Sequence, residues 1–367
     1  MRKAIHSFLG RLQEIMMING MKIVGSVAAT ASLLALQPLA AQESFPEFDD
    51  LAASNVGLLL EGFVYPGGTM QAEDGQPTCN GTEVAGGSWH GSGVIIDPDG
   101  TMLTNWHVAG RAVRGTARFH SQAVYEVRYI KAYDQFNDLA TLRIAANQQF
   151  VPVSLGDSDT VRPLDRVLAV GNPGGQGINV TEGGVSQIIQ DDNLEPLLVR
   201  HTAPITGGNS GGALYRGSEV IGINVSTWQG TGFQQAVPIN RARELLDFDE
   251  PVLLADAFSP QRAVSPNDLI HLDSVTGSLE PQGSAAAINF LDGLTDYVFV
   301  VTTAEDADVN LLIADSQGGL FGCSASPSLG KEVLIKTVDY PQEVRFLIVN
   351  PTDQYVPAVL DIYKVRW

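Results

Sequence analysis

The seven residues from Thr206 to Gly212 could support nucleophilic chemistry. They place Ser210 in a glycine-rich loop, Thr-Gly-Gly-Asn-Ser-Gly-Gly. Serine is a weak nucleophile unless a base can take its proton, and the oxyanion that follows needs N–H donors beside it. Glycines let the backbone adopt positive φ and approach a substrate closely. Because glycine and serine clusters are commonly plain turns, the prediction depends on a base and its orienting group elsewhere in the chain.

Both of these groups precede the serine. The segment Thr104-Asn105-Trp106-His107-Val108 ends a predicted strand, and Asp138 opens an apolar-alternating run over residues 139–144. In a catalytic triad the histidine takes the serine proton, while the aspartate fixes the imidazole tautomer and stabilises the imidazolium. The predicted catalytic residues are therefore His107, Asp138 and Ser210.

Chain order excludes an α/β-hydrolase site. That site needs an acidic residue and then a histidine after the serine, with the serine on a strand-to-helix turn. Only His271 follows Ser210, and residues 213–223 have the pattern of a β-hairpin. The sequence therefore does not fit an α/β-hydrolase.

Residues from about 45 to 246 resemble a trypsin-fold serine protease of the bacterial HtrA/Deg type. The resemblance implies a double β-barrel, serine endopeptidase activity without a cofactor or metal, and an oxyanion hole made by the backbone N–H groups of Gly208 and Ser210. It also makes a trimer possible, although the sequence leaves the oligomeric state open. The segments that carry the resemblance occur in family order: 91–96, 104–108, 138–140, 208–214 and 220–224.

The primary specificity pocket is predicted at Pro204, Ile205, Ser226 and Thr227. None of these residues is acidic, so we expect cleavage after small or medium aliphatic residues rather than after arginine or lysine. His201 is the one residue that keeps a glutamate-binding pocket open as an alternative. Its position in an apolar-alternating segment favours a place beside the barrel core.

The N-terminus has the pattern of an export signal. Lys22 is followed by twenty uncharged residues, and Ala40-Ala41 suits cleavage by a signal peptidase. We therefore predict a signal peptide over residues 1–41, with translation starting at Met1 or Met21, and a periplasmic or extracellular protein. The alternative is an uncleaved anchor, because about 20 apolar residues can span a bilayer.

The chain is strongly acidic. Its formal net charge is −19, and residues 1–41 contain four basic residues and one acidic residue, which leaves −22 on the remainder. This charge argues against binding to nucleic acid or to anionic membranes, so a membrane association is expected only if the N-terminal segment stays uncleaved. The expected partners are unfolded or exposed polypeptide substrates.

Two cysteines, Cys79 and Cys323, allow one disulfide in an oxidising compartment. Cys79 lies in the predicted protease domain, so a bond between the two would clamp that domain to the C-terminal region. Two unpaired, buried thiols are the alternative. Neither cysteine belongs to a cluster with the spacing of a metal site.

The C-terminal region has a different pattern. The predicted protease domain, residues 42–250, is followed by a linker over 251–267 and a β-sandwich accessory domain over 268–367, since short alternating strands are separated by turns. This region weakly resembles bacterial pre-peptidase C-terminal domains and has no recognisable PDZ loop. Its carboxylates Asp292, Asp296, Asp306 and Asp308 are interpreted as exposed turn residues rather than a calcium site.

The whole chain is thus predicted to be mainly β, a double-barrel trypsin-like domain followed by a β-sandwich. Two classes of function follow. The first is an exported serine endopeptidase. The second is a catalytically silent protease-like protein that uses the sandwich to recognise a surface or polymer.

Overall fold

The computed structural model describes residues 46–367 with short gaps at 68–69, 74–75, 80, 82–83, 192, 226–233, 249, 261–264, 294, 304–306, 326–329 and 339–340. The predicted signal peptide, residues 1–41, lies outside the described residues, as do Ser226 and Thr227. Across the ranges that are described, every helix is too short or too polar to cross a membrane.

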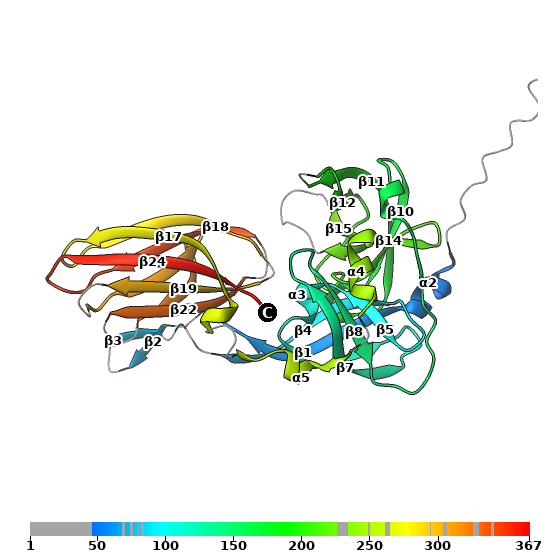
Figure 1. The fold of residues 1–367 in the computed structure, drawn as a ribbon, viewed down its shortest axis with the longest axis horizontal. Coiled ribbons are helices and arrows are strands. Elements are labelled where there is room, and N and C mark those ends of the chain that lie inside the picture. The colour runs from blue at the N-terminus through cyan, green and yellow to red at the C-terminus, as the bar shows by residue number, and fades with distance from the viewer. Residues whose placement is uncertain are drawn as a thin grey trace, which may run out of the picture. The chain divides into compact units, whose positions relative to one another are not determined.

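The first half of the predicted protease domain is a closed barrel, drawn in blue and cyan in Figure 1. Six strands follow one another in the order β7-β6-β1-β4-β5-β8, and the pairing of β7 with β8 closes the ring. Gly100, at φ 89°, completes the turn between β4 and β5, as the Asp-Gly sequence predicts. The strands are β1 (Asn55–Val64), β4 (Ala85–Ile95), β5 (Thr101–Thr104), β6 (Ala112–Arg118), β7 (Val124–Asp134) and β8 (Leu139–Ile144), preceded by helix α2 (Phe48–Ser54).

A second closed barrel follows, drawn in green in Figure 1. Its strand order is β13-β10-β11-β12-β15-β14, closed by pairing of β13 with β14, and a short strand, β9 (Ser154–Leu155), adds to β14 in parallel. Alternating apolar residues of these strands fill the interior, as in Val167 and Ala169 of one strand. The strands are β10 (Arg166–Gly171), β11 (Asn179–Gln190), β12 (Pro196–His201), β13 (Ala213–Arg216), β14 (Glu219–Val225) and β15 (Gln234–Pro238), followed by α4 (Arg243–Leu246).

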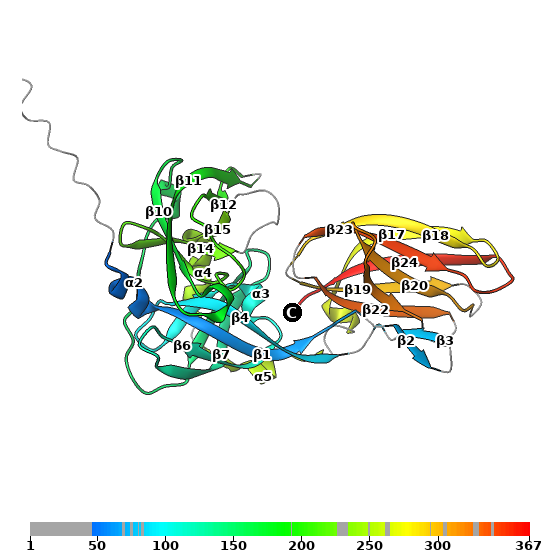
Figure 2. The same cartoon turned by 180° about the vertical axis from the view of Figure 1, so that it is seen from behind.

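The C-terminal strands form two four-stranded antiparallel sheets, and all of their strands except β21 are labelled in Figure 2. One core cluster, which includes Phe299, Phe346 and Leu360, draws its residues from both sheets. The fold is therefore mainly β throughout, as predicted. The sheets have the orders β17-β24-β19-β22 and β18-β23-β20-β21, with bounds Leu269–Leu279 (β17), Ser284–Leu291 (β18), Thr295–Thr303 (β19), Asn310–Asp315 (β20), Leu320–Ser324 (β21), Lys331–Val338 (β22), Gln342–Val349 (β23) and Val356–Val365 (β24).

The segment between barrel and sandwich carries secondary structure of its own. Strand β16 (Val252–Leu253) adds to β7 of the first barrel, and helix α5 (Leu254–Ala257) follows at once. Leu254 and Phe258 are buried in the core cluster of that barrel, together with Val298 and Trp367 of the sandwich region. One apolar core thus extends from the first barrel into the sandwich.

The expectation that the sandwich carboxylates are exposed turn residues is wrong for Asp296. Its side chain is fully buried. It accepts hydrogen bonds from Thr337 Oγ1 at 2.6 Å and Trp367 Nε1 at 2.7 Å, and it pairs with Arg111 Nη1 at 3.2 Å. A buried charge requires this kind of compensation, because an unpaired carboxylate would lose its hydration with nothing in return.

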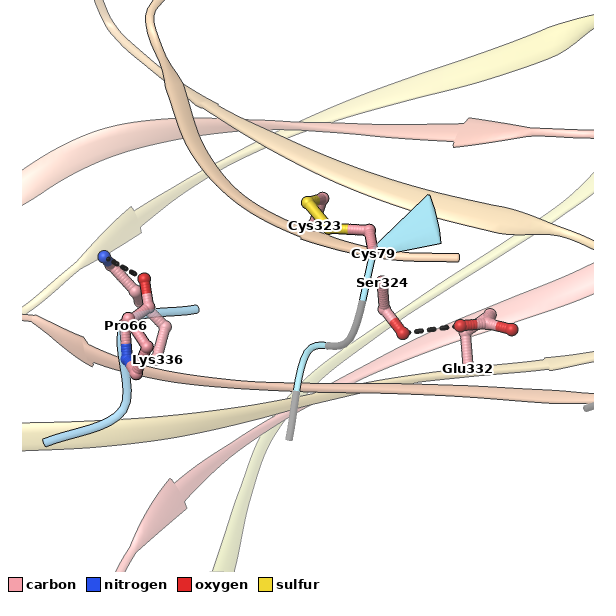
Figure 3. Close-up of a disulfide and its surroundings, with 6 residues drawn as sticks. All are labelled: Pro66, Cys79, Cys323, Ser324, Glu332 and Lys336. Atoms are coloured by element: carbon pink, nitrogen blue, oxygen red, sulfur yellow. Dashed lines mark hydrogen bonds between the residues drawn. A yellow bond between two sulfur atoms is a disulfide. The ribbon is translucent and has the colours of Figure 1, made fainter. Parts of the chain in front are cut away.

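The connection between β1 and β4 runs along the edge of the sandwich. It contains the hairpin β2 (Met70–Glu73) and β3 (Gln76–Cys79), and Cys79 forms a disulfide with Cys323 of β21 (Figure 3). Backbone N–H groups of the sandwich donate to this connection, from Cys323 to the Gly67 carbonyl at 2.7 Å and from Ile335 to the Gly81 carbonyl at 2.7 Å. The connection thus extends the sandwich by backbone pairing, and the disulfide fixes it covalently.

The Arg111–Asp296 pair yields a stability prediction. Replacing Asp296 by Asn leaves the Arg111 guanidinium buried without its counter-charge, so the free energy of unfolding should fall by about 3–5 kcal/mol. The matched control is Glu61→Gln, which breaks the exposed Arg114–Glu61 pair and should cost less than about 1 kcal/mol. Urea unfolding of the full chain measures both variants, and equal losses would contradict the prediction.

Candidate active site

His107 and Asp138 lie together at the rim of the first barrel. His107 belongs to a one-turn helix, α3 (Trp106–Ala109), directly after β5, and Asp138 immediately precedes β8. The imidazole Nδ1 is 2.8 Å from Asp138 Oδ2, and the backbone N–H of His107 donates to Oδ1 at 2.9 Å. This contact favours the tautomer with hydrogen on Nδ1, which leaves Nε2 free to accept a proton.

The backbone at Asp138 is held in a left-handed conformation, with φ at 53°. Aspartate tolerates this region better than most residues do. The Asn105 side chain donates to the Asp138 carbonyl at 2.9 Å, so the residue before α3 fixes the backbone that carries the carboxylate. The histidine and the aspartate are therefore positioned by the same local hydrogen bonds.

An aromatic cluster supports the helix that carries His107. The Trp106 ring stacks on Tyr133, with 4.6 Å between ring centroids, and meets Phe258 edge-on, with 5.4 Å between centroids. Phe258 in turn contacts the Trp367 ring, whose centroid is 6.3 Å away. Trp106 is almost fully buried by these contacts. Since Phe258 follows α5 and Trp367 is the last residue, elements far from the barrel in sequence help to position this histidine.

Ser210 lies in the loop between β12 and β13 and is largely buried. Two glycines of this loop have conformations and surroundings that exclude a side chain. Gly208 has φ 97°, and a Cβ there would approach the Asn172 carbonyl oxygen to 2.5 Å. Gly211 has φ 85°, and a Cβ there would come within 2.2 Å of the Ser92 carbonyl oxygen. The glycine-rich sequence is thus required for the loop to pack against its neighbours.

The peptide between Gly207 and Gly208 is held by a hydrogen bond to its carbonyl. The Gly174 N–H donates to the Gly207 carbonyl at 2.9 Å. In a trans peptide the C=O and N–H point in opposite directions, so the Gly208 N–H is turned away from Gly174. The Gly207 carbonyl is thus engaged by a residue outside the loop that carries Ser210.

Ser92 braces the same loop, and sequence reasoning missed its role. Its hydroxyl donates to the Gly208 carbonyl at 2.7 Å and accepts from the Asn172 N–H at 2.8 Å, while its own N–H donates to the Ser210 carbonyl at 2.8 Å. The side chain is almost completely buried. The sequence marked residues 91–96 as a motif, but only the structure shows which atoms they contact.

Residues of the predicted specificity pocket are described only in part. Pro204 is exposed, and its carbonyl accepts a hydrogen bond from Thr181 Oγ1 at 2.8 Å. Ile205 is 5% exposed and belongs to a core cluster of the second barrel. Because Ser226 and Thr227 lie outside the described residues, the composition of this pocket stays a prediction.

His201 lies inside the second barrel. It is fully buried on β12, on the face shared by Val199 and Ala203, which is where its apolar-alternating segment predicts it. Burial lowers the pKa of this imidazole to about 4, from an ordinary value of 6.5. His201 is therefore neutral near pH 7, which suits a core residue.

Residues 91–223 match the family model of the trypsin-like peptidase domain. The match begins at the segment that contains Ser92 and includes His107, Asp138 and Ser210. It agrees with the two closed barrels and with the resemblance drawn from the sequence motifs. The match to the family model does not extend beyond these residues.

Similar proteins are bacterial serine endoproteases. The chain is 38% identical over 175 residues to the periplasmic pH-dependent serine endoprotease DegQ of Escherichia coli K12, covering 44% of this chain and 38% of that protein. It is 37% identical over 165 residues to a probable periplasmic serine endoprotease DegP-like of Brucella suis, covering 43% and 32%. A solved structure of the HtrA-type protease AlgW with a decapeptide aligns with a TM-score of 0.43 and 28% identity, covering 54% of this chain and 64% of that one. The chain therefore spans less than two-fifths of the length of these two curated relatives.

Acid should destabilise the protein through His201. Because folding lowers this pKa from 6.5 to about 4, the unfolded chain binds the proton more readily. The contribution of neutral His201 to the free energy of unfolding is complete above pH 6.5. It is lost as the pH falls towards 4, and the loss amounts to about 3 kcal/mol. His201→Met should remove this part of the pH dependence. Urea unfolding of both proteins between pH 4 and 7.5 measures it, and parallel curves would overturn the assignment.

Proposed function

We propose that this chain is an exported serine endopeptidase that hydrolyses peptide bonds in unfolded or exposed polypeptides. The observation that carries the proposal is the Asp138 carboxylate on Nδ1 of His107, 2.8 Å away, within a region that matches the trypsin-like peptidase domain. The similar proteins are serine endoproteases by name, which supports the same reaction class. No described contact and no comparison favours the catalytically silent alternative.

The mechanism assigns one role to each residue. His107 takes the proton of Ser210 through Nε2, the serine oxygen attacks the scissile carbonyl, and the imidazolium then protonates the departing amine. Asp138 holds the imidazole in the required tautomer and stabilises its charged form. The backbone N–H groups of Gly208 and Ser210 receive the oxyanion, and each such donor contributes roughly 3 kcal/mol to transition-state stabilisation. Water then releases the acyl group by the reverse sequence of proton transfers.

Specificity is proposed to reside on the second barrel. We assign the primary pocket to Pro204, Ile205, Ser226 and Thr227, with cleavage after small or medium aliphatic residues. The lack of an acidic residue at these positions supports this preference over one for arginine or lysine. Burial of His201 with a lowered pKa supports a core position for it rather than contact with a glutamate substrate.

The remaining parts are proposed to serve export and support. Residues 1–41 would act as the signal peptide of a periplasmic or extracellular protein, a place consistent with the periplasmic relatives. Residues 42–250 would form the protease domain and residues 268–367 the accessory sandwich. The burial of Val298 and Trp367 in the core cluster of the first barrel supports a structural role for the sandwich.

Active-site labelling tests the proposal directly. A fluorophosphonate probe should form an adduct with the full chain, and Ser210→Ala should abolish both the adduct and casein cleavage, because the attacking oxygen is gone. Ser88→Ala, an exposed serine on β4, is the control and should label like the wild type. A folded wild-type chain that gave neither adduct nor cleavage would refute the endopeptidase assignment.

Ser92 should act as a positioning residue for the oxyanion hole. Ser92→Ala removes the hydroxyl that holds the Gly208 carbonyl, so kcat should fall at least tenfold while KM changes little, as for loss of a transition-state interaction. Ser92→Thr, which keeps the hydroxyl, should recover part of the loss. Steady-state kinetics on a peptide substrate measure both constants. A loss confined to KM, or none at all, would contradict this role.

A further inference from the structure

A small pocket lies on the outer face of the first barrel, next to the segment 172–178 that contacts the loop carrying Ser210. Its volume is about 230 Å³. The floor comes from β1, where Gly57 and Leu59 lie, and the segment 172–178 forms the opposite wall. A Cβ at Gly57 would lie 2.5 Å from Asn172 Nδ2, so only glycine at this position lets that wall approach the strand.

Strand register places the basic residues of the pocket on one face. Arg118 of β6 pairs with Gly57, and His90 of β4 pairs with Leu59. Residues paired across antiparallel strands share a face, and positions two apart along a strand also share one, so both side chains are on the side of Leu59. The inward-facing Leu58 and Leu60 confirm that this is the outer face.

The pocket carries positive charge in a protein that is otherwise acidic. Arg118, His90 and His120 line it, and none of its thirteen lining residues is acidic. Eight other arginines each pair with a carboxylate, whereas Arg118 has no ion-pair partner among the described residues. An unpaired guanidinium beside imidazole and amide donors is suited to bind a carboxylate.

The wall of the pocket is connected to the catalytic loop. Asn172 donates its N–H to the Ser92 hydroxyl, and that hydroxyl donates to the Gly208 carbonyl. Gly175 lies so close to His90 that a Cβ would approach the ring to 2.6 Å. Two successive hydrogen bonds therefore connect Asn172, in the wall of the pocket, to Gly208 in the proposed oxyanion hole.

The pocket lies on the barrel that carries His107. The proposed specificity pocket, which takes the acyl half of the substrate, is on the second barrel. The amine half must meet His107, which protonates it, and His107 is on the first barrel. The proposed reaction therefore directs the residues after the cleaved bond toward the barrel whose strands β1, β4 and β6 line this pocket.

We propose that this pocket is a leaving-group subsite that binds a carboxylate of the substrate, with Arg118 as its principal ligand. The carboxylate belongs to an aspartate or glutamate a few residues after the cleaved bond, or to the C-terminus of a short leaving segment. This inference rests on the proposed function for its orientation. The binding of a carboxylate can be measured without turnover.

The binding experiment uses the full-length Ser210→Ala chain and fluorescein-labelled decapeptides. Each peptide has an aliphatic residue at the cleavage position and either Asp or Asn at one of the three following positions. Fluorescence anisotropy should show about tenfold tighter binding of the best Asp peptide than of its Asn partner, as expected for one partly desolvated ion pair. A second arm compares a free C-terminal carboxylate with an amide at the same distances and identifies which carboxylate is bound.

Two charge-matched variants decide the role of Arg118. When Arg118→Gln is added to the Ser210→Ala chain, the dissociation constants of each acid peptide and its amide partner should agree within about twofold. Arg114→Gln removes the same charge from the same strand, but Arg114 pairs with Glu61 and does not line the pocket, so the ratios should persist. Equal binding of acid and amide peptides in both arms would overturn the subsite, as would preferences that survive Arg118→Gln or vanish equally in Arg114→Gln.

Labelling separates the two proposals. If a fluorophosphonate labels Ser210 but no Arg118-dependent preference is found, the endopeptidase stands and the subsite is wrong. If the preference is found but Ser210 is not labelled, the carboxylate site stands and the proposed reaction is wrong.

Discussion

The arrangement around His107 depends on the ion pair and hydrogen bonds of the buried Asp296 carboxylate. It joins Arg111, at the start of a barrel strand, to Thr337 and to the C-terminal Trp367. Trp367 is thereby held against Phe258 in the same aromatic cluster that packs on Trp106. Breaking this buried ion pair would cost the protein several kcal/mol of stability. The sandwich therefore belongs to the structural support of His107 and is not a separate appended module.

The loop that carries Ser210 is held by a different kind of constraint. The two cysteines of the chain are paired with each other at the sandwich edge, so no disulfide braces this loop. Buried hydroxyls do so instead: Thr104 Oγ1 donates to the Ser92 carbonyl at 2.7 Å, and Ser92 bonds on to the Gly208 carbonyl. Glycine is required where these groups approach the loop, because a Cβ at Gly211 would lie 2.2 Å from the Thr104 hydroxyl.

Much of the fold and part of the site could be predicted from the sequence. Period-two alternation and turn residues predicted the mainly β class, because these signals are local. Chain order and the resemblance to HtrA/Deg motifs predicted His107, Asp138 and Ser210 as candidates. Ser92 and Asp296 could not be recognised, because their roles come from partners far away in sequence, Gly208 in one case and Arg111 in the other. Ser92 has the sequence pattern of an ordinary strand residue, and Asp296, just before the predicted strand 297–303, has that of an ordinary turn residue.

The charge distribution also depends on placement rather than on composition. A net charge of −19 predicts repulsion of acidic ligands, and the arginines that pair with carboxylates add no free positive charge. Arg118 differs because it lies opposite Gly57 and lines a pocket that contains two imidazoles and no carboxylate. Long-range repulsion is screened within about 10 Å at ordinary ionic strength, whereas a contact inside a pocket is not. An acidic protein can therefore bind a carboxylate at this one position without contradiction.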